Sequence, residues 1–122
     1  MDIDEAKKVF ELFTGEENGE EYFMILSLAV YETETMLRPE ADPTDVRLNY
    51  LAAAIAYYRV QQILAARERA AVTYAGKVLK ESQNSAYEYS KLLLRDYMQI
   101  CSDLIKPQNF IFSSFSNGEE VQ

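Results

Sequence analysis

Few residues of this chain could do chemistry. The sequence holds one cysteine, no histidine and a group of acids near its N-terminus. Histidine is the commonest general base and supplies the imidazole ligand of many metal sites, so both roles are excluded here. The four glycines match no phosphate-binding or dinucleotide-binding motif. The sequence therefore indicates no catalytic, metal-binding or cofactor-binding residue, and we expect a protein that is not an enzyme and uses no cofactor.

Cys101 and the N-terminal acids are the remaining candidates. Cys101 lies on the apolar stripe of an expected helix and has no histidine to activate it, so a packed core thiol is the better interpretation. The acids that could in principle hold a divalent cation are Glu16, Glu17, Glu20, Glu21, Glu32 and Glu34. Neighbouring members point to different helix faces or lie on either side of a helix start, which favours a solvated acidic surface.

The net charge of −8 is concentrated at one end of the chain. Residues 1–40 contain eleven acids and three bases, whereas residues 41–122 contain nine of each. Two interpretations remain open. The chain has two solvated helix surfaces of different composition, or it is a charge-polar subunit that stacks head-to-tail on its neighbours, since residues 59–106 are mildly basic with eight lysines and arginines against five acids. It lacks the strong basic patch of a sequence-reading DNA-binding protein.

Four helices are expected to position these residues. Four short polar residues are each followed three positions later by an acid, the pattern of a capping box. The pairs are Asp2 with Glu5, Asn18 with Glu21, Asp42 with Asp45 and Ser85 with Glu88. Apolar stripes at helical spacing then predict helices over about 3–13, 19–37, 43–69 and 86–106. The sequence predicts an all-α fold, one four-helix domain over 1–106 with one short and three longer helices.

The helix predicted over 43–69 is apolar on most of its surface. No charged residue lies between Arg47 and Arg59. The small residues that permit close helix approach are Ala52, Ala53, Ala54 and Ala56. A helix of this kind is buried on several sides. We expect it to be either the centre of the domain or an element shared with a neighbouring subunit.

The connection between the third and fourth helices has a different composition. Residues 72–74 are strong strand formers, Gly76 can adopt the positive φ of a tight turn, and residues 77–80 would form a return strand. The sequence therefore predicts a small β-hairpin, which needs a surface to pack on. The residues that we expect to contact a neighbouring subunit or partner are Val72, Tyr74, Gly76, Lys77 and Val78.

Residues 107–122 are expected to form an aromatic C-terminal tail, partly disordered over its last seven residues. Phe110, Phe112 and Phe115 need burial, either on the helices of their own chain or on another subunit, and we include them in the expected interface. The longest uncharged apolar runs, 22–31 and 48–58, are shorter than the roughly 20 residues that cross a bilayer. No membrane association is expected.

Three segments over roughly residues 20–106 together follow the layout of a known family. They are MLRPEADPTDVRLNYLAAAIAYYRVQQILAARER, VTYAGKVLKES and YSKLLLRDYMQICSDLI. A turn before an alanine- and tyrosine-rich helix, a tyrosine-glycine connection and a closing helix resemble the head–tail connector, or adaptor, family of tailed bacteriophages. Members of this family are also known as phage DNA-packaging proteins.

The resemblance implies a homo-oligomeric ring below the portal of the capsid, which bridges head and tail and helps to retain packaged DNA. Its partners would be portal and tail proteins, with DNA passing through the lumen without sequence-specific binding. It would be located in the virion and in the cytoplasm of the bacterial host. Residues 72–80 and 110–115 would contact neighbouring subunits and the portal. An acidic lumen would let DNA slide, because phosphate binding needs lysine and arginine.

Two functions are therefore expected as alternatives. The first is a non-enzymatic structural protein of a phage or prophage that acts in virion assembly and DNA packaging. The second is a small acidic helical adaptor or chaperone that binds a protein partner through the helix over 43–69 or through the tail.

Overall fold

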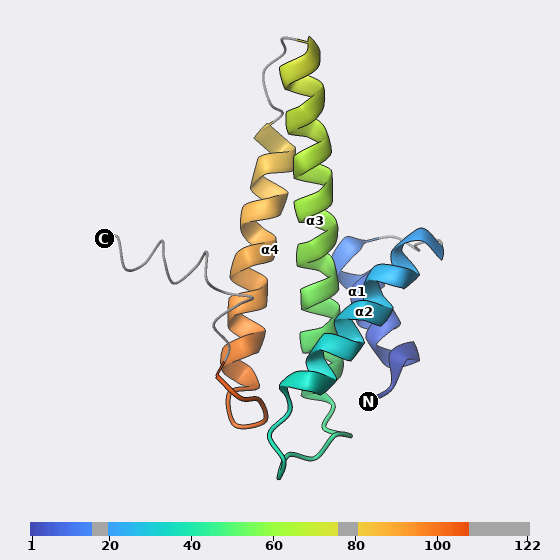
Figure 1. The fold of residues 1–122 in the computed structure, drawn as a ribbon, viewed down its shortest axis with the longest axis vertical. Coiled ribbons are helices and arrows are strands. Elements are labelled where there is room, and N and C mark those ends of the chain that lie inside the picture. Colours follow the sequence, from blue (N-terminus) through green and yellow to red (C-terminus); the bar gives the residue numbers. More distant parts are fainter. Residues whose placement is uncertain (16–19, 76–80, 108–122) are drawn as a thin grey trace, which may run out of the picture.

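The computed structural model describes residues 1–15, 20–75 and 81–107, with only the backbone of residue 20 and of residues 71–75 and 81–84. These residues form four helices: α1 (Ile3–Thr14), α2 (Glu20–Met36), α3 (Arg47–Ala75) and α4 (Glu81–Ile100). Figure 1 shows α3 along the long axis of the molecule, with α4 on one side and α1 and α2 on the other. The described residues contain no strand, and the predicted all-α fold of four helices is confirmed.

Helix α1 begins and ends where the sequence predicts. The Asp2 carboxylate accepts a hydrogen bond from the backbone N–H of Asp4 at 2.9 Å and caps the first turn. At the other end Gly15 adopts φ +80°, and its N–H donates to the carbonyl of Glu11 at 2.8 Å. The buried face of α1 carries Ala6, Val9 and Phe10.

Helix α3 begins later than predicted, because the residues interpreted as its first turn form a β-turn. Asp42 accepts hydrogen bonds from the backbone N–H and the hydroxyl of Thr44 at 2.9 and 2.7 Å. Its own carbonyl accepts from the Asp45 N–H at 3.2 Å. Pro43 is as favourable at the second position of such a turn as at the start of a helix. Asp45 provides the cap instead, accepting from the Arg47 N–H at 3.0 Å.

The prediction of a β-hairpin after the third helix is wrong for its first strand. Helix α3 continues to Ala75, so Val72 and Tyr74 lie in a helix. The other predicted hairpin residues, Gly76, Lys77 and Val78, lie outside the described residues. β-Branched and aromatic residues are only modestly unfavourable in helices, and the preceding AARERAA favours continuation of the helix. Strand propensity mainly expresses packing on a sheet, and the described chain offers no sheet here.

Helix α4 also differs from the prediction at both ends. It begins at Glu81, before the predicted cap at Ser85, and ends at Ile100. The chain then turns, and Ile105 forms an isolated antiparallel bridge with Leu37. This bridge connects the segment that leaves α4 to the end of α2.

Helix α3 is the centre of the domain. It packs against α1, α2 and α4, whereas α4 packs against neither α1 nor α2 through its described backbone. Every residue from Leu51 to Ala56 is buried. The four alanines of this segment let the surrounding helices approach closely, as the sequence indicates. The structure therefore agrees with the first interpretation of this helix, that it forms the centre of the domain.

Candidate functional site

Two of the predicted interface residues can be placed. Val72 and Tyr74 lie near the end of α3, whose 29 residues span about 43 Å at the rise of an α-helix. Figure 1 shows this end of α3 projecting beyond α1 and α2, so both residues belong to a helical projection. The remaining predicted residues lie outside the described part of the chain: Gly76, Lys77, Val78, Phe110, Phe112 and Phe115.

The described residues offer few groups for catalysis or metal binding. They contain no group of three or more histidine, cysteine, aspartate or glutamate side chains that could hold a metal ion. Cys101 is buried, and burial raises the pKa of its thiol to about 11. The Cys101 Sγ donates a hydrogen bond to the carbonyl of Arg47 at 3.6 Å. The thiol is therefore protonated at neutral pH and packed in the core, as the sequence indicates.

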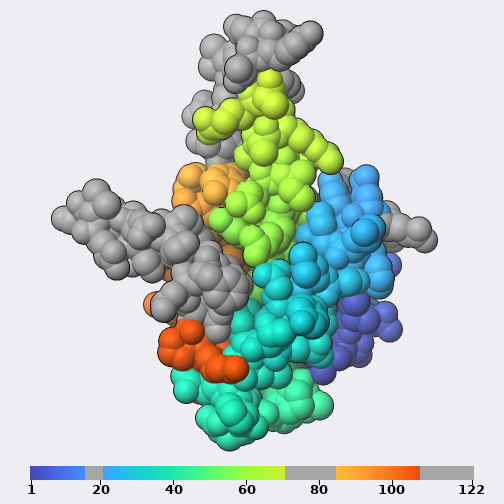
Figure 2. All heavy atoms as spheres, viewed as in Figure 1, coloured from blue at the N-terminus to red at the C-terminus, as the bar shows by residue number. Residues whose placement is uncertain are grey.

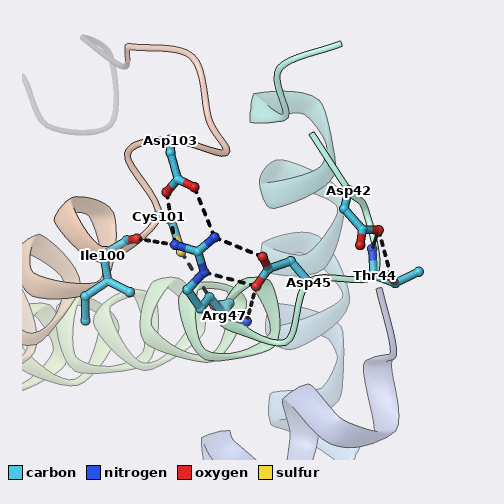
Figure 3. Close-up of polar contacts among 7 residues, drawn as sticks. All are labelled: Asp42, Thr44, Asp45, Arg47, Ile100, Cys101 and Asp103. Carbon is cyan, nitrogen blue, oxygen red and sulfur yellow. Dashed lines mark hydrogen bonds and ion pairs between the residues drawn. The ribbon is translucent and has the colours of Figure 1, made fainter. Parts of the chain in front are cut away.

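Arg47 joins the start of α3 to the end of α4 (Figure 3). Its Nε and Nη2 donate to the carboxylate of Asp45 at 3.1 and 2.9 Å. Its Nη1 and Nη2 donate to the carboxylate of Asp103 at 3.0 and 3.1 Å, and Nη1 also donates to the Ile100 carbonyl at 2.9 Å. We call Asp45, Arg47 and Asp103 the Arg47 clasp.

The geometry of the Arg47 clasp fits a structural role. Hydrogen bonds from Arg47 lower the pKa of Asp45 and of Asp103, and those two carboxylates raise the pKa of Arg47. The bonds above engage all five N–H donors of the guanidinium, so none is left for an anionic ligand. The clasp therefore fixes two helix ends against each other.

An apolar groove opens between α1 and α4. It has a volume of about 350 Å³ and is lined by Phe13, Tyr57, Tyr89, Leu92, Leu93 and Asp96. At its floor the Phe13 ring lies 6.1 Å from the Tyr57 ring, centroid to centroid. On the α4 side Tyr89 is 70% exposed and Leu92 is 50% exposed. We call this feature the α1–α4 groove.

A second apolar surface lies on the outer face of α2. Met24, Leu28 and Tyr31 follow helical spacing and are 77%, 54% and 63% exposed. They lie on the side of α2 opposite its buried residues Leu26, Ala29 and Thr33. Figure 2 shows α2, in cyan, covering part of α3 on the visible face of the molecule. We call Met24, Leu28 and Tyr31 the α2 ridge.

Sequence reasoning missed both surfaces and the clasp. The apolar run 22–31 lies within one predicted helix, but only tertiary packing decides which of its sides meets α3. For the clasp, the sequence shows Asp45 and Arg47 close together at the edge of an uncharged segment. Its third member is 56 residues from Arg47, and no local pattern connects them.

Comparisons of this chain with protein-family models, with curated proteins and with solved structures found no match. The search of the described helices for a membrane span was also negative, since none is both long and apolar enough. The proposals below therefore depend on the surfaces of the molecule.

Proposed function

We propose that this chain is a non-enzymatic structural protein of a phage or prophage, a connector subunit that forms a ring below the portal and bridges head to tail. The observation that carries the proposal is the pair of unlike apolar surfaces, the α2 ridge and the α1–α4 groove. Contacts between unlike surfaces are heterologous, and they close into a ring when the rotation between subunits permits.

The two surfaces are formed by different helices. The α2 ridge points away from α3, whereas the groove is bounded by α1, α3 and α4 and does not include α2. A subunit can therefore offer its ridge to one neighbour and its groove to another. Contiguous exposed apolar side chains are a common feature of protein–protein contact sites.

The charge distribution supports passage of DNA through such a ring. Eleven acids and three bases lie in residues 1–40, the segment that contains α1 and α2. A lumen lined by this segment would repel the phosphates of DNA, which could then slide. In this proposal the projecting end of α3 and residues 110–115 contact the portal and tail proteins, in the virion and during assembly in the host cytoplasm.

Light scattering after size-exclusion chromatography, over rising protein concentration, tests the proposal. We expect oligomers in the wild type, and a shift toward monomer in Leu92→Glu, which places a charge in the α1–α4 groove. The matched control is Gln99→Glu, which adds the same charge at another exposed position of α4. A wild-type protein that stays monomeric up to about millimolar concentration would contradict the proposal.

An acidic adaptor or chaperone remains the second candidate. The α1–α4 groove favours it, because a groove of about 350 Å³ with aromatic walls can accept side chains of a partner segment. This function predicts a monomer or dimer whose groove binds an apolar peptide. Leu92→Glu would then abolish peptide binding without changing the oligomeric state.

A further inference from the structure

We propose that residues 110–115, which we call the aromatic arm, dock on the α2 ridge of their own chain in the free subunit. This inference goes beyond the proposed function and does not depend on ring formation. It assigns an occupant to an exposed apolar helix face.

The point at which the arm begins is the first argument. Ile105 and Leu37 form an antiparallel bridge. Next to it, the Lys106 N–H donates to the carbonyl of Met36, the last residue of α2, at 2.8 Å. These contacts place Lys106 at the C-terminal end of α2, so the arm begins next to the helix that carries the α2 ridge.

The length of chain beyond the bridge is the second argument. At about 3.3 Å per residue, Phe110 can lie up to about 13 Å and Phe115 up to about 30 Å from Lys106. At 1.5 Å per residue along α2, Tyr31 lies about 7.5 Å and Met24 about 18 Å from Met36. The arm is therefore long enough to reach the whole α2 ridge.

Spacing and chemistry also match. Alternate residues of an extended chain point to the same side about 6.6 Å apart, and Phe110 and Phe112 are such a pair. The rise between Met24 and Leu28 along α2 is close to this, about 6 Å. Neither the arm nor the ridge contains a charged residue, so docking desolvates no charge.

The α1–α4 groove is a poorer site for this arm. It lies along the edge of α4 that faces α1, where the rings of Phe13 and Tyr97 are 5.8 Å apart. The bridge of Ile105 with Leu37 lies toward α2 instead.

Disulfide cross-linking of the full chain tests the proposal. Ser114→Cys, on the same side of an extended arm as Phe110 and Phe112, is combined either with Leu28→Cys on the ridge or with Leu92→Cys in the groove, two sites of similar exposure at 54% and 50%. Under mild oxidation of dilute protein, we expect an intramolecular disulfide with Leu28→Cys, at least tenfold faster than with Leu92→Cys. Ser114→Cys alone controls for reaction with the buried Cys101.

Each other outcome of the cross-linking counts against the proposal. Equal rates at the two sites would show that the arm has no preference for the ridge. A faster reaction with Leu92→Cys would place it in the groove. Disulfides that join two chains would show that the arm docks on a second copy. Any of these results overturns docking within one chain.

Proteolysis provides a second readout in the full chain. Chymotrypsin cleaves after phenylalanine, and cleavage of a docked arm follows the fraction of molecules in which it is released. We expect Leu28→Glu to raise the rate of cleavage in residues 110–115 about tenfold, whereas the matched Leu92→Glu leaves it unchanged. Equal cleavage of both variants and the wild type would overturn the proposal.

Discussion

At the scale of single residues, Arg47 links parts of the chain that no local pattern connects. Its partners Asp103 and Ile100 lie 56 and 53 residues away. An arginine side chain is long enough to reach many different hydrogen-bond acceptors. Its partners therefore follow from the packing of α3 on α4 and could not be predicted from the sequence. The burial of Cys101 could be predicted, since its position on the apolar stripe of one helix already determines it.

The lowered pKa values of Asp45 and Asp103 make the stability of the protein depend on pH. Carboxylates with depressed folded-state pKa values stabilise the fold above their unfolded-state pKa of about 4, and this contribution is lost as pH falls through the folded-state values. We expect the wild type to lose stability below about pH 4, and Asp103→Asn to lose less over the same interval.

Urea unfolding at pH 7 and at acidic pH measures this difference. Asp96→Asn, a carboxylate of α4 outside the Arg47 clasp, is the matched control and should follow the wild type. If Asp103→Asn and the wild type lose equal stability on acidification, the clasp does not couple folding to protonation.

Cys101 should be protected from thiol reagents by the fold. Its pKa of about 11 and its burial leave almost no accessible thiolate at neutral pH. We expect a thiol-reactive dye to label it at the rate of unfolding, and to label the exposed site of Leu92→Cys within minutes. Rapid labelling of Cys101 in the native wild type would contradict its placement in the core.

At the scale of elements, the sequence was informative about which helices exist and less so about where they begin. The signals around α1 are unambiguous, because Asp2 and Gly15 have no competing local role. Asp42 and Pro43 suit a β-turn as well as a helix start, and the turn is formed. Near Val72, strand propensity was outweighed by continuation of a long helix, which tertiary context decides.

Gly15 is the position where backbone conformation alone should determine the effect of a substitution. Its φ of +80° is strained for residues with a Cβ, although a Cβ there would meet no atom within 4 Å. We expect Gly15→Ala to lower the free energy of unfolding by about 1 kcal/mol, and Gly15→Asn by less, because asparagine tolerates this conformation. Chemical denaturation measures both, and equal effects of the two would contradict a backbone origin.

At the scale of the whole molecule, the exposed apolar surfaces depend on how all four helices pack, so no single helix predicts them. If the α2 ridge and the α1–α4 groove drive assembly, the net charge of −8 opposes it by repulsion between subunits. We expect association to strengthen as salt rises from about 50 to 500 mM, because salt screens that repulsion. Sedimentation velocity at both salt concentrations measures this.

The opposite salt dependence would favour a different arrangement. Subunits that stack through oppositely charged ends would associate more weakly at high salt, because salt would screen an attraction. Such a result would contradict assembly through the apolar surfaces and would support the second interpretation of the charge distribution.

The bridge of Ile105 with Leu37 and the Arg47 clasp both lie at one end of α4. Helix α4 is therefore held by additional contacts at its C-terminal end, whereas its described backbone packs only on α3 along the remaining length. We expect α4 to separate from α3 first at its N-terminal end, which lacks these contacts. Amide hydrogen exchange in α4 should accordingly be slowest near Ile100 and become faster toward Glu81. The N-terminal part of α4 can then separate from α3 while the contacts around Ile100 remain intact.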